Sequence, residues 1–312
     1  MEAIDSGALS YDTVVTASAH ACSMGGSQIW LKENEQMTVA DMLKAVCVVS
    51  ANDCAVALGE AISGSEDAFV EKMNQRAKEL GMNDTTFKNA TGLPAEGHIT
   101  SAHDIALMSR ELILNHPDIR QYTTIWMDTL RNGQSELVNT NKLIRFYEGA
   151  TGLKTGSTDN ALYCLSGTAE RDGMELIAVI MKDVTSAQRF EDAKTLLSYG
   201  FSTYALKHIT PETPLPPIPV TLGTQATVQP VLGEGDTLLM EKTNASDLQQ
   251  TVSLAESLAA PVCVGDPVGT LCVTTSSGEL VAEIPLLAGE EVPRITYGQM
   301  LLRVLRLAFL AA

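Results

Sequence analysis

Two short polar motifs in the chain combine residue types that acyl transfer from a peptide requires. One is Lys154-Thr155-Gly156-Ser157, and the other, Ser50-Ala51-Asn52, lies 104 positions earlier (154 − 50). A lysine on a strand edge supplies positive charge for a carboxylate, and a glycine beside it lets an extended ligand lie close to the strand. A serine and an asparagine in a turn suit proton transfer and contact with an amide. We therefore predict catalytic roles for Ser50 and Asn52, and substrate binding by Lys154, Thr155, Gly156 and Ser157.

Covalent acyl transfer also needs a nucleophile with a base beside it. No serine in the chain has a lysine three positions later, so a Ser-x-x-Lys pair is not found in this sequence. Each of the two motifs is weak alone, because Lys-Thr-Gly-Ser also ends ordinary strands and Ser-x-Asn also caps helices. Their combination is specific, since the first runs into a helix and the second is followed by two apolar strands.

Helical signals surround the Ser50-Ala51-Asn52 motif. Thr38 is an N-cap with Asp41 in the capping-box position, and apolar residues then recur at helical spacing up to position 49. A second helix is expected over residues 53–62, closed by Gly64. The motif therefore forms the turn between two helices. Further helices are predicted from Ser65 to about 80 and from Ser101 to about 115.

Strand signals surround Lys154. Residues 152–156, 162–169 and 174–181 are β-prone, and Asp172-Gly173 between the last two is a hairpin signal. A helix over residues 186–199 follows, with Gly200 as its C-cap. We predict an α/β (α+β) domain with an antiparallel sheet and a helical subdomain.

The remainder of the chain has a different character. Five prolines between positions 211 and 219 predict a stiff linker over 210–219, which separates a first domain, 1–209, from a small all-β domain over 220–293. Residues 294–312 predict an amphipathic helix that carries Arg303 and Arg306. A position on a membrane surface is favoured for this helix over packing on its own β domain or on a second subunit.

Composition excludes several functions. The net charge of −17 argues against a nucleic-acid partner, and no run of 18 apolar residues exists that could span a membrane.

The six cysteines form no Cys-x-x-Cys pair, so no metal site is expected. Cys263 and Cys272 could face each other across a hairpin, but their spacing alone favours free thiols over a disulfide. His98, His103 and His116 are expected to be surface or capping groups.

The chain resembles the D-alanyl-D-alanine carboxypeptidases, the low-molecular-weight penicillin-binding proteins of the penicillin-binding and β-lactamase superfamily. The resemblance runs from about Met1 through Phe201 and continues into a β-rich C-terminal domain and an amphipathic anchor. Four stretches carry it: residues 50–58, residues 66–74, Thr91-Gly92-Leu93-Pro94 and residues 152–158.

The resemblance implies a role for each site residue. Ser50 would relay a proton, Asn52 would hold the substrate amide, and Lys154 and Thr155 would bind the terminal carboxylate. Ser157 stands where many relatives have histidine. Arg189 matches a family arginine that helps to receive the carboxylate, and the alternative is a solvated helix-face charge paired with Glu191 or Asp192.

The resemblance also implies the reaction and its location. Such an enzyme removes the terminal D-alanine of peptidoglycan pentapeptides through an acyl-serine intermediate, uses no metal or organic cofactor, and is acylated by β-lactams. It works in the cell envelope, at the outer face of the cytoplasmic membrane. One alternative is a protein that binds D-alanyl-D-alanine ends without catalysis. The other is a β-lactamase, which the proline linker and the β domain disfavour.

The N-terminus departs from the family pattern. In relatives the nucleophilic serine and its lysine open a buried helix shortly before the position of Met1, preceded by two strands and an export signal. This departure allows three explanations. Met1 is an internal methionine of a longer active enzyme, or the product is truncated and inactive, or the protein is a relative that only binds D-alanyl ends. We expect the first, because everything downstream of Met1 keeps the layout of a working enzyme.

Overall fold

The computed structural model describes residues 1–243 and 247–310. The chain forms two compact units, Met1–Phe201 and Ser202–Ala312, each of which is described by itself. The division precedes the domain boundary expected at 209/210. The reason is that β8 (Tyr204–His208) pairs along its whole length with β12 (Thr237–Glu241) of the second unit.

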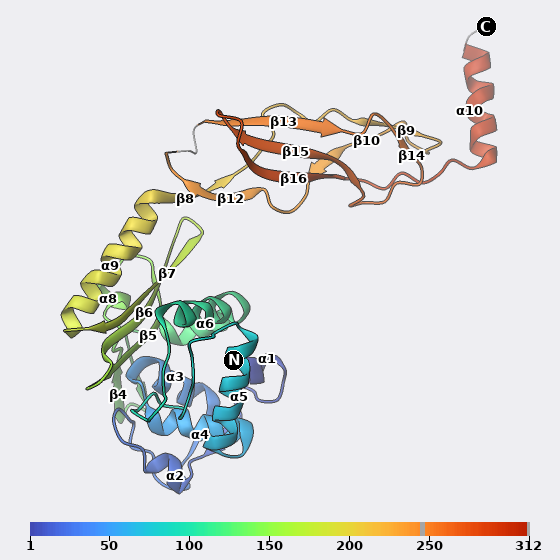
Figure 1. Cartoon of the computed structure of the whole chain (residues 1–312). Coiled ribbons are helices and arrows are strands. Elements are labelled where there is room, and N and C mark those ends of the chain that lie inside the picture. The colour runs from blue at the N-terminus through green and yellow to red at the C-terminus, as the bar shows by residue number, and fades with distance from the viewer. Residues whose placement is uncertain (244–246, 311–312) are drawn as a thin grey trace. The chain divides into compact units, whose positions relative to one another are not determined.

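The first unit is mostly helical in its N-terminal half (Figure 1), where α3 (Val39–Val49) and α4 (Asn52–Ser63) contribute much of one apolar core. Thr38 caps α3 through its side chain, which accepts a hydrogen bond from the Asp41 backbone N–H at 3.1 Å, as predicted. The apolar face of this helix is buried, with Met42 and Val48 fully inaccessible. The helices of this half are α1 (Glu2–Asp5), α2 (Ala19–Cys22), α3 (Val39–Val49), α4 (Asn52–Ser63), α5 (Glu66–Glu79) and α6 (Ala102–Asn115).

The C-terminal half of the first unit is built on an antiparallel sheet in the order β5-β6-β7, with β5 (Ala150–Thr158), β6 (Leu162–Arg171) and β7 (Met174–Asp183). The predicted hairpin between β6 and β7 is confirmed. Asp172 and Gly173 adopt φ values of 52° and 77°, which is the left-handed backbone that a two-residue hairpin loop requires. Within this sheet β5 has a partner on one side only.

Helices cover both faces of this sheet (Figure 1). Ser109 of α6 bonds the Ser166 hydroxyl at 2.7 Å, and Ser166 pairs with Val179 across the strands. Leu176 of β7 points to the opposite face, three residues from Val179, and meets α9 (Ser186–Thr203).

The predicted C-cap at Gly200 is wrong, because α9 continues through this residue to Thr203. A Cβ at position 200 would lie 2.5 Å from Leu176 Cδ1. Glycine is therefore needed here for close packing of helix on sheet, and not for ending the helix.

Short elements complete the first unit and hold its two halves together. Thr140, just after β4, donates its backbone N–H to the Val48 carbonyl of α3 at 3.0 Å. The short elements are β1 (Val14–Thr16), β2 (Gln36–Thr38), the 3-10 helix η1 (Pro117–Ile119), α7 (Arg120–Thr123), β3 (Met127–Leu130), β4 (Ser135–Val138) and α8 (Leu143–Phe146).

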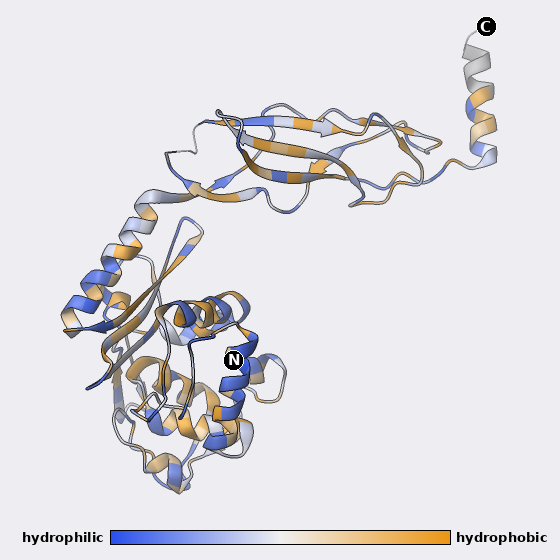
Figure 2. Ribbon diagram, in the orientation of Figure 1, coloured by the Kyte–Doolittle hydropathy of each residue, from blue (hydrophilic) through white to orange (hydrophobic). Residues whose placement is uncertain are grey.

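The second unit is a β module with its own apolar core, which includes Leu271, Ile284 and Leu286. Hydrophobic residues recur along β15 and β16 (Figure 2), and the fully buried ones include alternate positions such as Leu271 and Val273 or Ile284 and Leu286, as expected for sheets with one face buried. The strands besides β8 and β12 are β9 (Ile218–Thr221), β10 (Thr227–Val228), β11 (Pro230–Leu232), β13 (Leu248–Leu254), β14 (Leu258–Ala259), β15 (Pro267–Thr275) and β16 (Leu280–Ala288).

Two details of this module refine the sequence analysis. β9 begins at Ile218, so the last two residues of the predicted 210–219 linker belong to a strand, and Pro219 pairs only with Thr227 of β10. Cys263 and Cys272 are free thiols.

The predicted C-terminal helix is α10 (Tyr297–Leu310), and residues 311 and 312 of the predicted tail lie outside the described residues. Its side chains Leu301, Leu302 and Val304 are exposed. Within the described ranges, no helix is both long and apolar enough to cross a membrane.

Candidate active-site cleft

All seven predicted site residues line one cleft of the first unit, with a volume of about 510 Å³. The cleft lies between the turn that joins α3 to α4 and the strand β5. The seven residues are Ser50, Asn52, Lys154, Thr155, Gly156, Ser157 and Arg189.

Ser50 and Lys154 face each other across this cleft. Ser50 ends α3 in a left-handed conformation (φ 62°, ψ 36°), which turns the chain sharply before α4 begins at Asn52. The Lys154 ammonium donates a hydrogen bond to Ser50 Oγ and a second one, of 2.9 Å, to the Thr155 carbonyl oxygen. Two residues 104 positions apart thus form a direct amine–hydroxyl pair.

The cleft alters the acidity of Lys154. Burial lowers the pKa of its ammonium from 10.5 to about 8, and the nearby positive charge of Arg189 acts in the same direction, while Cys47 opposes both. An amine with a pKa near 8 is still largely protonated at neutral pH and can also exchange a proton with the Ser50 hydroxyl. Lys154 can therefore bind an anion and take part in proton transfer.

Asn52 is held at the start of α4 by the segment that follows α2. Its side chain donates to the Gly25 carbonyl at 2.7 Å, and its backbone N–H donates to the Ser27 carbonyl at 2.8 Å. Within residues 1–243 and 247–310, no hydrogen bond to its Oδ1 is present, so this oxygen is open to accept one from a ligand amide.

The remaining residues of the β5 motif differ in exposure. The Thr155 hydroxyl is buried and bonds the Thr140 hydroxyl at 2.7 Å. Gly156 and Ser157 are exposed, and a Cβ built at position 156 would meet no atom within 4 Å. The strand therefore presents an open surface at Gly156, as an extended ligand requires.

Arg189 belongs to the cleft and is not a solvated surface charge. It is 6% exposed and donates through Nη1 to the carbonyls of Gly156 (3.0 Å) and Cys164 (3.1 Å). Glu191 instead pairs with Lys194, and Asp192 accepts from Gln188. The predicted alternative of an Arg189 pair with Glu191 or Asp192 is therefore wrong.

Arg189 stabilises the cleft at β5 through its hydrogen bond to the Gly156 carbonyl. Its guanidinium lies 4.7 Å from the ring centre of Phe190, and burial lowers its pKa from the usual value. Its Nε is buried without a hydrogen-bond partner in the described part of the chain.

The cleft also contains residues for which the sequence predicted no role in the site. Two irregular segments, Gly26-Ser27 and residues 89–93, form the wall opposite β5, and Thr140 and His98 contribute to its lining. His98 was expected to be a surface or capping group, but it lines the cleft, its ring lies edge-on to Phe87 at 5.9 Å, and burial lowers its pKa. The Gly-rich run at 24–27 and Thr91-Gly92-Leu93-Pro94 were visible signals of irregular backbone.

The charge of the cleft is opposite to that of the whole chain. The chain carries a net charge of −17, yet the only charged side chains among the described cleft residues are Lys154 and Arg189. A cleft with two partly desolvated cations and no carboxylate selects an anionic ligand. A larger cavity of about 910 Å³ adjoins it and is lined mainly by aliphatic side chains, including Leu43, Ile105 and Leu165.

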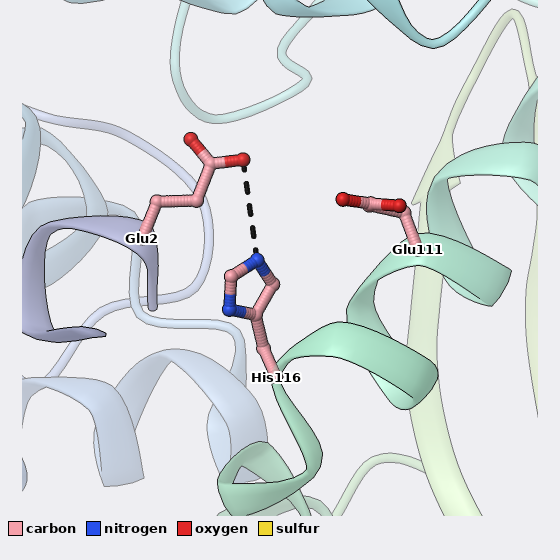
Figure 3. A group of neighbouring side chains, drawn as sticks. All are labelled: Glu2, Glu111 and His116. Atoms are coloured by element: carbon pink, nitrogen blue, oxygen red, sulfur yellow. Dashed lines mark ion pairs between the residues drawn. The ribbon is translucent and has the colours of Figure 1, made fainter. Parts of the chain in front are cut away.

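One group of side chains elsewhere has metal-ligand types, namely Glu2, Glu111 and His116, whose ligand atoms lie within 4.8 Å of one another (Figure 3). The Arg76 guanidinium already pairs with Glu2 and with Glu111, each at 2.6 Å. Because this guanidinium supplies the positive charge that the carboxylates need, the group is an ion-pair network and we assign it no metal.

Comparison with known proteins agrees with this geometry. The family model of D-alanyl-D-alanine carboxypeptidases matches residues 1–185, and that of the penicillin-binding protein 5 C-terminal domain matches residues 210–294. The D-alanyl-D-alanine carboxypeptidase DacF of Bacillus subtilis is 39% identical over 310 residues, which cover 98% of this chain and 79% of that protein.

Solved structures show the same relationship. Penicillin-binding protein 5 from Haemophilus influenzae matches with a TM-score of 0.73 at 27% identity, over 94% of this chain and 86% of that one. Penicillin-binding protein D2 from Listeria monocytogenes, solved in an ampicillin-bound form, matches with a TM-score of 0.58 at 35% identity, over 64% of this chain and 81% of that one. The chain therefore belongs to the D-alanyl-D-alanine carboxypeptidases, the serine-type penicillin-binding enzymes of low molecular weight.

Proposed function

We propose that the cleft binds the D-alanyl-D-alanine end of a peptidoglycan stem peptide, with its terminal carboxylate toward Lys154, Thr155 and Arg189. The observation that carries this proposal is the isolated pair of cations in a cleft without carboxylates on an acidic protein. An extended peptide would lie along the free edge of β5 at Gly156, where main-chain hydrogen bonds can form. The Asn52 side chain would accept from a substrate amide.

Ser50 and Lys154 would move protons during hydrolysis of the terminal peptide bond. Their direct hydrogen bond and the lowered pKa of Lys154 support a relay that delivers a proton to the departing D-alanine amine. Ser157 would contribute a further hydroxyl beside the carboxylate. The nucleophilic serine and lysine of a Ser-x-x-Lys motif do not occur in the sequence, so these residues account for binding and proton transfer only.

β-lactams would enter the same cleft. A β-lactam carries a carboxylate next to its reactive amide, which matches the arrangement of cations and amide contacts proposed for the peptide. The ampicillin-bound form of the Listeria relative supports this proposal.

Binding of a peptide that ends in Lys-D-Ala-D-Ala tests the proposed function. The wild-type chain is expected to bind it, and amidation of the peptide C-terminus should weaken binding by at least about 100-fold, because it removes the partner of two cations. Lys154→Met should weaken binding similarly, whereas Lys142→Met, a change at an exposed lysine of the same unit, should not. Equal affinity for the free and amidated peptides would disprove the proposal.

Release of D-alanine in the same samples separates catalysis from binding alone. Release that depends on Lys154 supports carboxypeptidase activity. Binding without release supports the second candidate function, a protein that holds D-alanyl-D-alanine ends without cleaving them.

We further propose that α10 lies on the outer surface of the cytoplasmic membrane. The helix presents exposed Leu301, Leu302 and Val304 together with Arg303, a pattern that suits the interface of a bilayer. A membrane-surface position would keep the first unit near newly made peptidoglycan in the cell envelope.

A further inference from the structure

Two irregular segments form the wall of the cleft opposite β5, and one carboxylate lies between the elements that carry them. The segments are residues 24–27, which follow α2, and residues 89–93, which follow α5. Neither has regular secondary structure, so individual contacts with neighbouring elements determine where each one lies.

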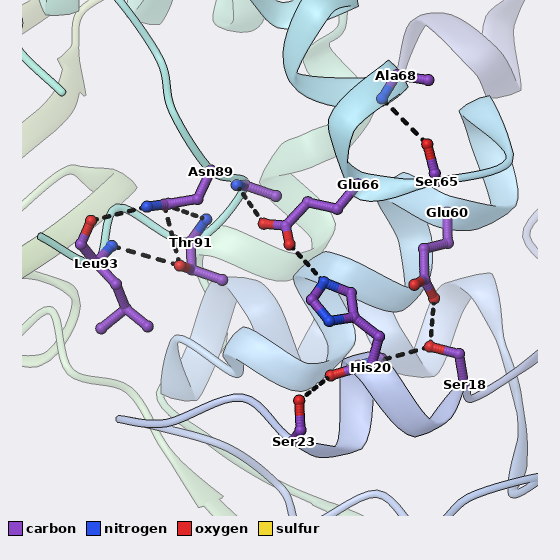
Figure 4. A network of polar contacts seen from close by, with 12 residues as sticks. Ser18, His20, Ser23, Glu60, Ser65, Glu66, Ala68, Asn89, Thr91 and Leu93 are labelled. Carbon is purple, nitrogen blue, oxygen red and sulfur yellow. Dashed lines mark hydrogen bonds and ion pairs between the residues drawn. The ribbon is translucent and has the colours of Figure 1, made fainter. Parts of the chain in front are cut away.

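The 89–93 segment is rigid within itself. Asn89 Oδ1 accepts hydrogen bonds from the Thr91 N–H (3.2 Å), the Thr91 hydroxyl (3.1 Å) and the Gly92 N–H (2.8 Å), while Asn89 Nδ2 donates to the Leu93 carbonyl at 2.8 Å (Figure 4). The Asn89 side chain thus provides hydrogen-bond partners for backbone groups of residues 91–93 and connects the two ends of the segment. An external contact can therefore position all of it.

That contact is made by Glu66, the first residue of α5. Its Oε1 accepts the Ala90 backbone N–H at 2.9 Å, and its Oε2 lies 2.7 Å from His20 Nε2 on α2 (Figure 4). The Glu66 side chain is 14% exposed. One carboxylate thus joins the 89–93 segment to the helix from which the 24–27 segment departs.

Both supporting helices are anchored independently of Glu66. Phe69 of α5 packs so closely on Gly59 of α4 that a Cβ at position 59 would lie 2.7 Å from its ring. Ser18, the N-cap of α2, donates to Glu60 of α4 at 2.7 Å. The Glu66 carboxylate therefore has a fixed position from which it can locate a loop.

The two segments meet beside Asn52. A Cβ built on Gly26 would lie 2.8 Å from Asn52 Nδ2 and 3.6 Å from Leu93 Cδ2. A shift of the 24–27 segment would therefore disturb the Asn52 amide, which donates to the Gly25 carbonyl, and Leu93 lines the cleft beside Gly26.

We propose that Glu66 is a positioning residue for substrate: by holding Ala90 and His20 with one carboxylate, it fixes Leu93 beside Gly26 and Asn52 in one wall of the cleft. The inference rests on the proposed binding of D-alanyl-D-alanine ends. Glu66 lines neither the cleft nor the adjoining cavity, so its effect passes through the two segments.

The test compares substitutions at Glu66 by peptide binding and by hydrogen exchange. Glu66→Ala leaves the Ala90 N–H without its charged acceptor, so its exchange should accelerate and affinity for a Lys-D-Ala-D-Ala peptide should fall by about tenfold. Glu66→Gln retains an acceptor for Ala90 and should bind within about twofold of the wild type. Glu71→Ala, a change at an exposed glutamate on the same helix, is the matched control and should alter neither quantity.

Glu66→Asp provides the same test if Glu66→Ala does not fold. It keeps the charge at the start of the helix but withdraws the carboxylate by one methylene, so Ala90 exchange should again accelerate and binding should weaken. Wild-type affinity and wild-type Ala90 exchange in Glu66→Asp or Glu66→Ala would overturn the proposal. If the wild-type chain binds no such peptide, the proposed function fails, and the Ala90 exchange rates still decide whether Glu66 holds the segment.

Discussion

Lys154 is the residue whose chemistry depends most on its surroundings. A solvated lysine would stay protonated far above neutral pH, but burial and the nearby Arg189 lower the pKa of this one to about 8. It donates to Ser50 Oγ, so the same ammonium can bind a carboxylate and exchange a proton. The two roles depend on pH in a way that can be measured.

Peptide binding should depend on the protonation of Lys154. Only the ammonium form attracts the peptide carboxylate, so affinity should be constant below pH 8 and should then fall by up to about tenfold per pH unit. Titration of the dissociation constant from neutral to alkaline pH checks this. A constant affinity across that range in the wild type would contradict a role for the Lys154 charge.

The same pKa shift has a consequence for stability. Because the folded protein releases the Lys154 proton at about pH 8 and the unfolded chain releases it near 10.5, the unfolded state holds more protons between these values. The free energy of unfolding should therefore rise with pH in this window, relative to Lys154→Met. Urea unfolding of both proteins at several pH values measures the difference, and parallel stability curves would contradict the shift.

Gly156 offers a substitution that separates binding from folding. A side chain at this position points into open space, and its backbone does not need glycine, so Gly156→Val should change the thermal midpoint by less than about 2 °C. The new side chain would occupy the surface where the peptide lies, so peptide affinity should fall by at least about tenfold. Calorimetry and peptide titration of the same sample give both values. Undiminished affinity would place the peptide elsewhere.

At the scale of elements, the turn between α3 and α4 carries two of the seven predicted site residues, Ser50 and Asn52. Ser50 ends one helix in a left-handed conformation, and Asn52 begins the next. Asp53 follows them and is fully buried, where it accepts the backbone N–H groups of Ile29 (3.3 Å) and Leu31 (3.0 Å). This carboxylate attaches the 24–31 region to α4 just beside the cleft.

Asp53→Ala should therefore destabilise the first unit. The substitution leaves buried N–H groups without an acceptor, which should lower the free energy of unfolding by ~3 kcal/mol. Asp67→Ala, at an exposed aspartate near the start of α5, should change it by less than ~0.5 kcal/mol. Chemical denaturation of both variants gives the comparison. Similar small losses in the two would show that Asp53 is not a structural anchor.

At the scale of the whole molecule, the chain separates into two units with distinct apolar cores. The first carries the cleft, and the second carries α10 after a β module. This division assigns chemistry to one unit and leaves attachment as the proposed task of the other.

Membrane attachment should depend on α10. The full chain is expected to co-sediment with vesicles of phosphatidylcholine and phosphatidylglycerol, whereas a chain that ends at residue 294 should stay in the supernatant. Replacement of Leu301 and Leu302 by serine should reduce sedimentation without affecting peptide binding. Equal sedimentation of full and shortened chains would exclude α10 as the attachment.

The sequence by itself determined the features that depend on near neighbours. The Thr38 cap, the Asp172-Gly173 hairpin and the helix–turn–helix arrangement around Ser50 each depend on a few consecutive residues, so local steric and hydrogen-bond preferences suffice to predict them. Resemblance to a family then predicted that the Ser50-Ala51-Asn52 and Lys154-Thr155-Gly156 motifs share one site.

Only the tertiary structure decided the features that depend on distant partners. Gly200 serves packing on Leu176, Arg189 is buried against Gly156 and Cys164, and Glu66 contacts both Ala90 and His20. A glycine at a helix end and an arginine on a helix look the same in sequence whether they are packed or solvated. The physical reason is that burial and long-range contacts, which set their roles and their pKa values, exist only once the elements have assembled.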